Sequence, residues 1–485
     1  MRKHHWLRKV WFAASFGVLL SACGYGGGAE GSRANLALST VSADDVIAIS
    51  NGLDRVQITV QLKNLRGERL TTSDGVLTFE TPSQGEIEAI TDVGDGTYTA
   101  RYRSLGPAAT VTLQPLLDGR RLKETLDVSV QATDNGFFVD TNGAIIRCGD
   151  AEDGDTAEIA LDGQTALVYT KRNYAQLETL VRTDGDYDSA VRSCTSGITA
   201  LNDQDPDGPT GLFENISDFN LPLNHWDTSS VTDMRRAFVN ADLFNQPLDL
   251  WDTSNVESFN HMFSLADRFN GRVDTWNTSR ALDMEYMFND AHQFNQDVSG
   301  WDTSRVTNME SMFRDVNLFN QDIGGWDTSN VTDMSRLFDD NWSFNQDLSD
   351  WDTSSVTTMA FMFNDAYSFN QDISQWNVSN VESMNDMFSD AVSFSADLSD
   401  WDTSNLQEVQ SMFKYALSFN SDIGGWNVSN VFDMTSMFNG AANFDQDLSG
   451  WCVQNAVLYS DIFVGTTMET KTQNHPPFGS LDNCS

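Results

Sequence analysis

Apolar and polar positions repeat with a period of 25 residues over the second half of the chain. Tryptophan opens each unit, from Trp226 to Trp451, and phenylalanine occupies positions 13 and 19 of all nine complete units in residues 226–450. A fixed period of this length is the sequence signature of a repeat protein. One unit cannot bury a tryptophan and two phenylalanines alone, so we expect the units to stack and to cover one another's apolar side chains.

The apolar positions inside a unit predict its secondary structure. Positions 6, 9, 13 and 16 are apolar in most units, and Val331, Met334 and Phe338 are three examples. Their spacing predicts a short helix, for which Ser329 is a suitable N-cap. Positions 19 to 23, as in residues 319–323, alternate in part between apolar and polar and predict a short strand. The repeats are therefore predicted to form an α/β solenoid with one short strand and one short helix per unit.

The flanks of the repeats are predicted to be separate modules. Residues 37–131 contain several short alternating runs, such as 56–62 and 96–102, with glycine-containing turns between them. About seven short strands in this length predict an all-β sandwich. Residues 132–225, which include a degenerate first repeat, and residues 451–485 are predicted to be the caps that the two ends of a repeat array need.

The beginning of the chain has the features of an export signal. Residues 1–22 place basic side chains before an apolar run that is too short to cross a membrane. The segment Leu20-Ser21-Ala22-Cys23 resembles a bacterial lipobox, which implies that Cys23 is lipidated and becomes the mature N-terminus. Gly24 after this cysteine implies, by the same resemblance, sorting to the outer membrane. The alternative is an ordinary secretion signal that ends near a cysteine.

A flexible tether is predicted after the lipidated cysteine, because residues 23–36 are rich in glycine. Four further cysteines then remain, and they lie in pairs at the two ends of the repeats: Cys148, Cys194, Cys452 and Cys484. Exported proteins can form disulfides, so the close pairs are predicted to be bonded, Cys148 with Cys194 and Cys452 with Cys484. Four cysteines allow three pairings, and free buried thiols are a further alternative.

Acidic residues dominate the charge of the chain. The sequence has 70 Asp and Glu against 29 Lys and Arg, a formal net charge of −41. Residues 226–450 alone hold 36 acidic and 9 basic side chains, which is a net charge of −27. A surface of this sign argues against nucleic-acid binding and against docking on anionic lipid head groups.

The strongest metal-binding motif is the segment 203–214. Asp203, Asp205 and Asp207 alternate along it, a glycine follows, and Glu214 takes the twelfth position. This is the ligand pattern of a calcium loop, although the flanks lack the paired helices of an EF-hand. Two interpretations stay open: a calcium site made by these four carboxylates, or a surface turn rich in Asp, Pro and Gly.

Aspartate also recurs at unit position 22, from Asp297 to Asp447. Stacked on neighbouring units, these carboxylates would lie about 5 Å apart and repel one another. Bound divalent ions or a cationic partner would relieve the repulsion. The alternative is a solvated acidic face that salt screens.

Two parts of the chain resemble known families. The motif from Trp326 to Ser335, followed by Phe344-Asn345-Gln346-Asp347-Leu348, resembles the BspA-like leucine-rich-repeat surface proteins of bacteria. This resemblance implies a curved solenoid that binds partners or mediates adhesion. Residues 58–64 and 94–100 resemble bacterial Ig-like domains of the invasin type, which implies a spacer or a binding module.

The sequence predicts a binding protein that is not an enzyme. It contains no nucleophile elbow, phosphate-binding loop or zinc-protease motif. The leading hypothesis is an exported lipoprotein, lipid-anchored in the outer membrane and surface-exposed, whose solenoid binds a protein or glycan of a host or neighbouring cell. The alternative is a structural or scaffolding protein of the cell envelope. A secreted hydrolase is a third class, against which the regularity of the repeats argues.

Overall fold

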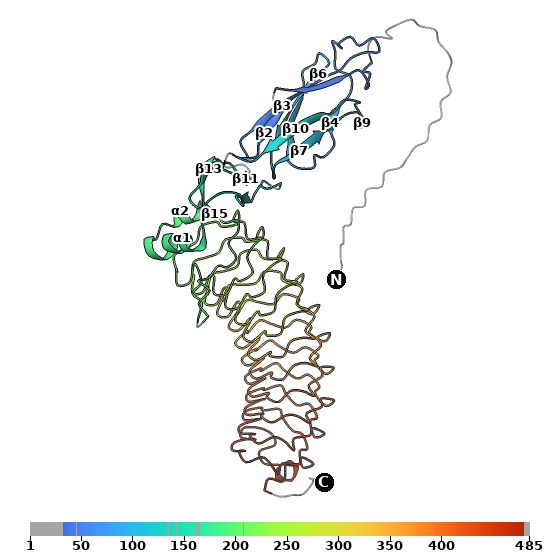
Figure 1. Ribbon diagram of the computed structural model, residues 1–485. Coiled ribbons are helices and arrows are strands. Elements are labelled where there is room, and N and C mark those ends of the chain that lie inside the picture. The colour runs from blue at the N-terminus through green and yellow to red at the C-terminus, as the bar shows by residue number, and fades with distance from the viewer. Residues whose placement is uncertain are drawn as a thin grey trace, which may run out of the picture.

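The computed structural model describes residues 33–479 apart from 45, 134, 142, 162–164 and 207. Figure 1 shows a strand-rich N-terminal region, a small junction that carries two short helices, and a long stack of coils that runs to the C-terminus. The predicted signal peptide, Cys23 and Cys484 lie outside the described residues. Among the described helices, none has the length and apolar content that a bilayer crossing requires.

The N-terminal region consists of three small sheets around one hydrophobic core. The sheets have the following orders: β1 (Thr40–Ala43), β3 (Arg55–Gln61), β6 (Thr97–Arg103), β5 (Glu86–Asp92); β2 (Ile47–Ile49), β10 (Leu126–Gln131), β7 (Ala109–Leu113); and β4 (Leu77–Phe79), β8 (Pro115–Leu117), β9 (Arg120–Arg121). Strand β3 shows why the core forms, because Val56, Ile58 and Val60 are buried at alternate positions.

The predicted two-sheet sandwich is wrong for this region. Its strands are divided among three sheets, and several of them are only two to three residues long. Glycines with positive φ flank these short strands, Gly75 before β4 and Gly119 between β8 and β9. A register shift between Glu88 and Thr91 also interrupts the pairing of β5 with β6. The region has ten strands where the sequence predicts about seven, and they are divided among three sheets in place of two facing ones.

The junction between the two large regions is a compact group of short elements. They are β11 (Phe138–Val139), β12 (Ile146–Arg147), β13 (Thr156–Ile159), β14 (Leu167–Lys171), α1 (Tyr174–Glu178), the π-helical turn η1 (Thr179–Asp184), α2 (Tyr187–Val191) and β15 (Ser193–Cys194). A disulfide joins Cys148 to Cys194, as the sequence predicts. Cys452 is also disulfide-bonded, while its predicted partner Cys484 is not among the described residues.

Each repeat unit forms one coil, and successive coils stack in parallel (Figure 1). Parallel β-bridges join position 8 of each unit to position 8 of the next, from Asp233 through Ser258 and onward to Leu458. Further along the unit, the Phe238 amide donates to the carbonyl of Met262 at 2.9 Å. The backbone hydrogen bonds of a unit are therefore divided between tight turns within the unit and bonds to its neighbours.

The predicted α/β solenoid is wrong, because no unit contains the helix or the strand. In the described residues, α-helix is confined to α1 and α2, and one 3-10 turn, η2 (Thr472–Asn474), follows the last coil. Positions 11 and 15 of the units adopt left-handed φ, for example 54° at Tyr286 and 58° at Asp290, which a right-handed helix cannot accommodate. The Tyr286 amide donates instead to the Glu310 carbonyl of the next coil, at 2.8 Å.

The predicted strand fails for a related reason. At its first residues the amide partner is a side chain: the Asn345 N–H donates to Oδ1 of Asn320 at 2.9 Å, and the Asn370 N–H donates to Oδ1 of Asn345 at 2.9 Å. A ladder of asparagine side chains thus takes the place of a β-ladder on this side of the stack.

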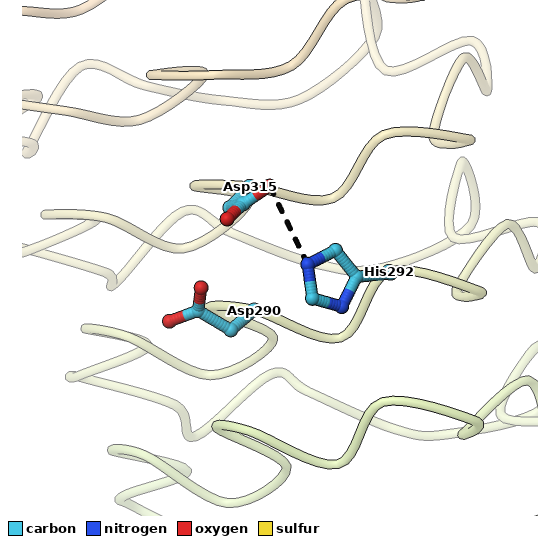
Figure 2. A group of neighbouring side chains, drawn as sticks. All are labelled: Asp290, His292 and Asp315. Atoms are coloured by element: carbon cyan, nitrogen blue, oxygen red, sulfur yellow. Dashed lines mark ion pairs between the residues drawn. The ribbon is translucent and has the colours of Figure 1, made fainter.

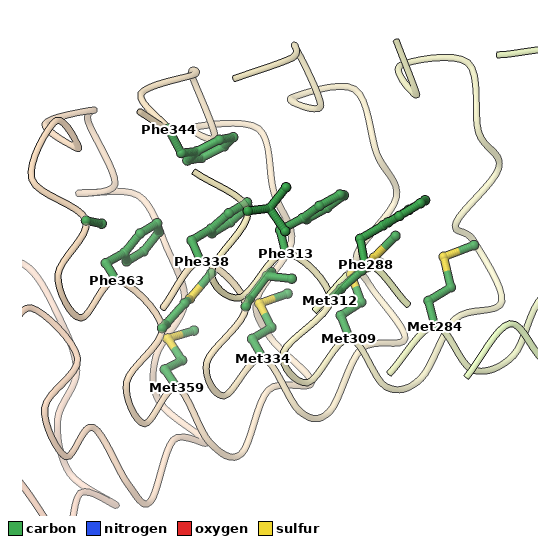
Figure 3. Packing of buried hydrophobic residues seen from close by; sticks show 14 of the residues in the cluster. Met284, Phe288, Met309, Met312, Phe313, Met334, Phe338, Phe344, Met359 and Phe363 are labelled. Carbon is green, nitrogen blue, oxygen red and sulfur yellow. The ribbon is translucent and has the colours of Figure 1, made fainter. Parts of the chain in front are cut away.

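Columns of identical apolar side chains fill the stack, as predicted (Figure 3). The rings of Phe288 and Phe313 stack 5.8 Å apart, and Phe288 also stacks on Phe294 of its own unit at 3.8 Å. The buried Trp301 indole donates to the Val273 carbonyl two units back at 3.2 Å. Each ring is covered by the units on either side, so the core has no boundary between units.

Candidate functional site

Aspartate occupies unit position 15 in five consecutive units, which we call the acidic row: Asp290, Asp315, Asp340, Asp365 and Asp390. All five have left-handed φ between 54° and 58°, a conformation that aspartate tolerates better than most residues. Each amide donates to the next coil, as Asp340 does to the Asn364 carbonyl at 2.8 Å. The fold therefore sets five carboxylates at the same corner of five stacked coils.

The carboxylates of the acidic row disfavour one another's charge. Burial, together with the charges of Asp339, Asp365 and Asp315, raises the pKa of Asp340 to about 6. Burial and Asp365 raise the pKa of Asp390. The row is thus a place where a positive charge would be stabilised.

One end of the row carries a histidine (Figure 2). The His292 Nε2 lies 3.5 Å from Oδ1 of Asp315, and its Nδ1 lies 2.8 Å from Oδ1 of Asp267. One ligand atom each from Asp290, His292 and Asp315 lies within 4.8 Å of the others, and no second group of this kind occurs in the described part of the chain.

This group has the donor set of a divalent metal site. An imidazole with two carboxylates suits a transition-metal ion, and Asp267 would fix the tautomer of the histidine. Asparagine amides hold both carboxylates, because Asn289 donates to Asp290 at 2.6 Å and Asn317 donates to Asp315 at 2.9 Å. Burial and contact with Asp315 raise the pKa of Asp290, an effect that a bound cation would reverse.

An exposed pair of aromatic rings lies beside the middle of the row. Trp342 and Tyr367 occupy position 17 of adjacent units and are 49% and 40% exposed. Their rings stack with centroids 6.1 Å apart and planes 21° apart. The Tyr367 hydroxyl donates to Oδ1 of Asp365 at 3.0 Å, which joins the pair to the acidic row.

The structure does not gather the predicted calcium ligands. The Asp203 carboxylate accepts the amide of Asp205 at 3.1 Å, as in an Asx turn, and the amide of Thr210 at 2.8 Å across the loop. The Glu214 carboxylate is engaged by the guanidinium of Arg236, one coil further along. Asp207 is outside the described residues, and the other three do not form a group of ligands within reach of one ion. Calcium binding at this loop stays a prediction.

The carboxylates at unit position 22 do repel one another, since Asp347 and Asp397 act to raise the pKa of Asp372, but local hydrogen bonds outweigh this effect. Each of these exposed carboxylates accepts hydrogen bonds from a residue two positions later, as Asp347 does from the Ser349 amide at 2.9 Å. These bonds lower the pKa of Asp347 and of Asp397. The acidic row at position 15, which sequence reasoning missed, could have been found from the same kind of recurrence.

A cavity of about 480 Å³ lies at the junction, away from the acidic row. Lys171 lines it and is only 8% exposed, and burial lowers the pKa of its ammonium group. The ammonium donates to the Ser196 carbonyl, two residues from the disulfide-bonded Cys194. This lysine therefore has a structural role in fixing the junction.

Family comparisons assign the two large regions. Residues 209–323, 296–399 and 372–475 match the family described as "Mycoplasma protein of unknown function, DUF285". Together these matches cover residues 209–475, which is more than half of the 485-residue chain. The chain belongs to the DUF285 family. The DUF285 repeats are preceded by a match to domain 3 of invasin over residues 35–133. The narrower assignment to BspA-like leucine-rich-repeat proteins stays a prediction.

Solved structures similar to this DUF285 protein include bacterial invasin, described as an integrin-binding protein, and the adhesin InvE and InvD of Yersinia pseudotuberculosis. Their sequence identities are 26%, 24% and 22%, and the matches cover 21%, 22% and 19% of this chain. The same matches cover 20%, 29% and 27% of those chains, with TM-scores of 0.19, 0.19 and 0.18. No curated protein matches the chain. The invasin-type assignment therefore rests on the family match.

Proposed function

We propose that this protein is a surface-exposed bacterial lipoprotein that binds a partner on another cell through the acidic row and its neighbouring aromatic pair. The observation that carries the proposal is the invasin domain 3 match at residues 35–133, on the N-terminal side of the junction and the repeat stack. A similar solved protein, invasin, is described as integrin-binding, which supports a cell-surface partner in general. The proposed role is binding, without catalysis.

The order of the regions suits display at a distance from the membrane. A lipid on Cys23 would anchor the chain, and bacterial lipoprotein cysteines carry several acyl chains, which gives firm attachment. The glycine-rich tether and the invasin-type domain would then separate the stack from the membrane. The acidic row lies on the stack, where a partner can reach it.

Adhesion by displaying cells tests the proposal. A non-adherent bacterium that produces the full chain should bind host-matrix proteins or epithelial cells, and the Cys23→Ser variant should lose both surface display and adhesion. An antibody against the stack should label intact cells that carry the unaltered chain. Labelled cells that adhere no better than the parent strain would contradict the proposal.

Separate variants test the acidic row. Changing all five aspartates of the row to asparagine should reduce adhesion without reducing antibody labelling. The matched control changes five exposed aspartates of unit position 22 to asparagine: Asp297, Asp322, Asp347, Asp372 and Asp397. This control removes the same charge, so an equal loss of adhesion in both variants would show that only net charge matters.

A further inference from the structure

We infer that the face made by Trp342, Tyr367 and the acidic row binds a basic polypeptide, with an arginine side chain seated on the aromatic pair. The inference rests on the proposed function, because it names the partner chemistry of the same face. Three independent observations support it: a break in the repeat pattern, an excess of negative charge, and an arginine of this chain that already uses the same mode of contact.

The repeat pattern breaks in the unit that carries Trp342. Position 16 is alanine or valine in the other eight units but is Asn341 here, and Trp342 follows it. Asn341 is fully buried, and its Nδ2 has no hydrogen-bond partner among the described residues. The core tryptophan of the same unit, Trp326, is 3% exposed, so Trp342 is a second tryptophan that the core does not use. Neither departure is needed for stacking.

The charge around the aromatic pair is balanced only in part by the chain itself, through Arg314 beside Asp340 and Lys414 beside Asp390. Residues 351–400 contain eight acidic and no basic side chains. The nearest cations along the sequence are already engaged: Arg314 and Arg336 pair with Asp339 at 3.2 and 3.3 Å. The ammonium of Lys414 lies 5.6 Å from the ring centroid of Tyr415. A positively charged partner would supply the missing charge.

An arginine of this chain shows how the contact would be made. The guanidinium carbon of Arg336 lies 4.0 Å from the ring centroid of Phe361, while its Nη1 lies 3.3 Å from Oδ2 of Asp339. One side chain thus combines ring stacking with carboxylate pairing. Trp342, Tyr367 and Asp365 offer the same combination to an arginine from outside. Tryptophan is the best aromatic partner for a cation, and a planar guanidinium stacks where an ammonium cannot.

The spacing of the units suits an extended segment. The rings of Trp342 and Tyr367 are 6.1 Å apart. Alternate side chains of an extended strand lie about 6.6 Å apart, close to the distance between these two rings. An extended segment with arginine at alternate positions could therefore seat one arginine on the pair and bring the next one to a neighbouring carboxylate.

Peptide binding to the full-length protein tests the inference. The probe is a fluorescent eight-residue peptide that alternates arginine and serine, and its binding is followed by anisotropy. We expect Trp342→Ala to weaken binding roughly tenfold. Asp365→Asn should also weaken it, and replacement of arginine by lysine in the peptide should weaken binding to the unaltered protein. Added salt should reduce the affinity.

Matched controls separate specific binding from general charge attraction. Asp447→Asn removes one exposed carboxylate outside the row, and Leu243→Ala removes an exposed apolar side chain in the first unit of the stack. Both controls should bind the peptide as the unaltered protein does. The inference is overturned if Trp342→Ala binds equally well, if Asp447→Asn matches Asp365→Asn, or if a neutral oligosaccharide or a divalent ion alone competes fully with the peptide.

The two proposals fail separately. If cells that display the protein adhere but the peptide does not bind, the partner is not basic. That result contradicts the arginine inference alone. If the peptide binds with the expected pattern but displaying cells do not adhere, the basic ligand is soluble and the adhesion proposal falls.

Discussion

Side chains at the corners of the coils determine what the stack can present. Positions 11 and 15 have left-handed backbone in nearly every unit, and aspartate fills position 15 five times in succession. Bulky residues occur there too, including Tyr286, Phe361 and Tyr415, and they bear the conformational cost of left-handed φ. The corners are therefore positions where a strained backbone conformation places carboxylates and aromatic rings on the surface of the stack.

Asn341 should reduce the stability of the fold. In the neighbouring unit the Phe369 amide donates to the backbone carbonyl of Ala366, whereas the Phe344 amide uses the Asn341 side chain. Asn341→Ala should restore the backbone bond and remove a buried unpaired donor, which stabilises the protein by about 1 kcal/mol. Urea unfolding measures the change. The equivalent change at a site that already fits the pattern, Val316→Ala, should destabilise the protein, and an unstable N341A protein would contradict the argument.

Asp340 should make stability depend on pH. Its pKa in the folded protein is raised to about 6, against about 3.9 for an unfolded aspartate, so folding takes up a proton between these values. Its contribution is therefore fully present below about pH 4 and is lost as the pH rises through about 6. Asp340→Asn should raise the melting temperature at pH 7.5 and flatten its change between pH 4 and pH 6.5.

The control for this pH prediction lies in the same unit. Hydrogen bonds from Ser349 lower the pKa of Asp347, so Asp347→Asn should not raise the melting temperature at pH 7.5. If both variants raise it equally, the effect is one of net charge and the argument from the acidic row fails.

Elements were harder to predict than residues in this protein. The period and the columns of Trp, Phe and Met follow directly from the sequence, because any stacked repeat must bury them. The absence of a helix could not be predicted from the sequence, because apolar spacings of three and four residues fit both a helix and the inward-pointing positions of a short coil. What separates the two is the partner of each amide, and the Tyr286 amide bonds to Glu310 in the next unit.

The candidate site was only partly predictable for the same reason. The contact of Glu214 with Arg236 crosses from one coil to the next, so the calcium motif could not show that its twelfth residue was already engaged. The row at position 22 has more members than the acidic row, yet local hydrogen bonds from the residue two positions later lower the pKa of members such as Asp347, Asp372 and Asp397. The acidic row has fewer members, but its carboxylates are partly buried and interact with one another.

The junction depends on the disulfide that joins Cys148, directly after β12, to Cys194 of β15. The bond closes a loop of 46 residues that contains α1, η1 and α2. Cys148→Ser with Cys194→Ser should lower the free energy of unfolding of the junction by about 2–5 kcal/mol. Limited proteolysis should then cut first within residues 148–194, while the coils near the C-terminus stay protected. Simultaneous cleavage throughout the stack would show that the junction nucleates the whole array.

At the scale of the molecule, stability should follow the number of units in register. Deleting residues 401–425 removes one whole coil outside the acidic row and brings equivalent positions of its neighbours together. We expect this variant to fold and to unfold cooperatively, with a modest loss of stability from one fewer interface. Deleting only residues 401–420 should abolish folding beyond that point, because every aromatic column would lose its register. Circular dichroism and tryptophan fluorescence during melting distinguish the two results.

The columns of identical rings have a consequence for inheritance. Every unit has the same length and nearly the same buried side chains. In-frame recombination between two units would therefore add or remove a complete coil, and the remaining coils would still pack against one another in the same way. The number of carboxylates offered to a partner can change by such events from one generation to the next. Avidity for a repetitive basic ligand would then vary among descendants while the affinity of each single contact stayed the same.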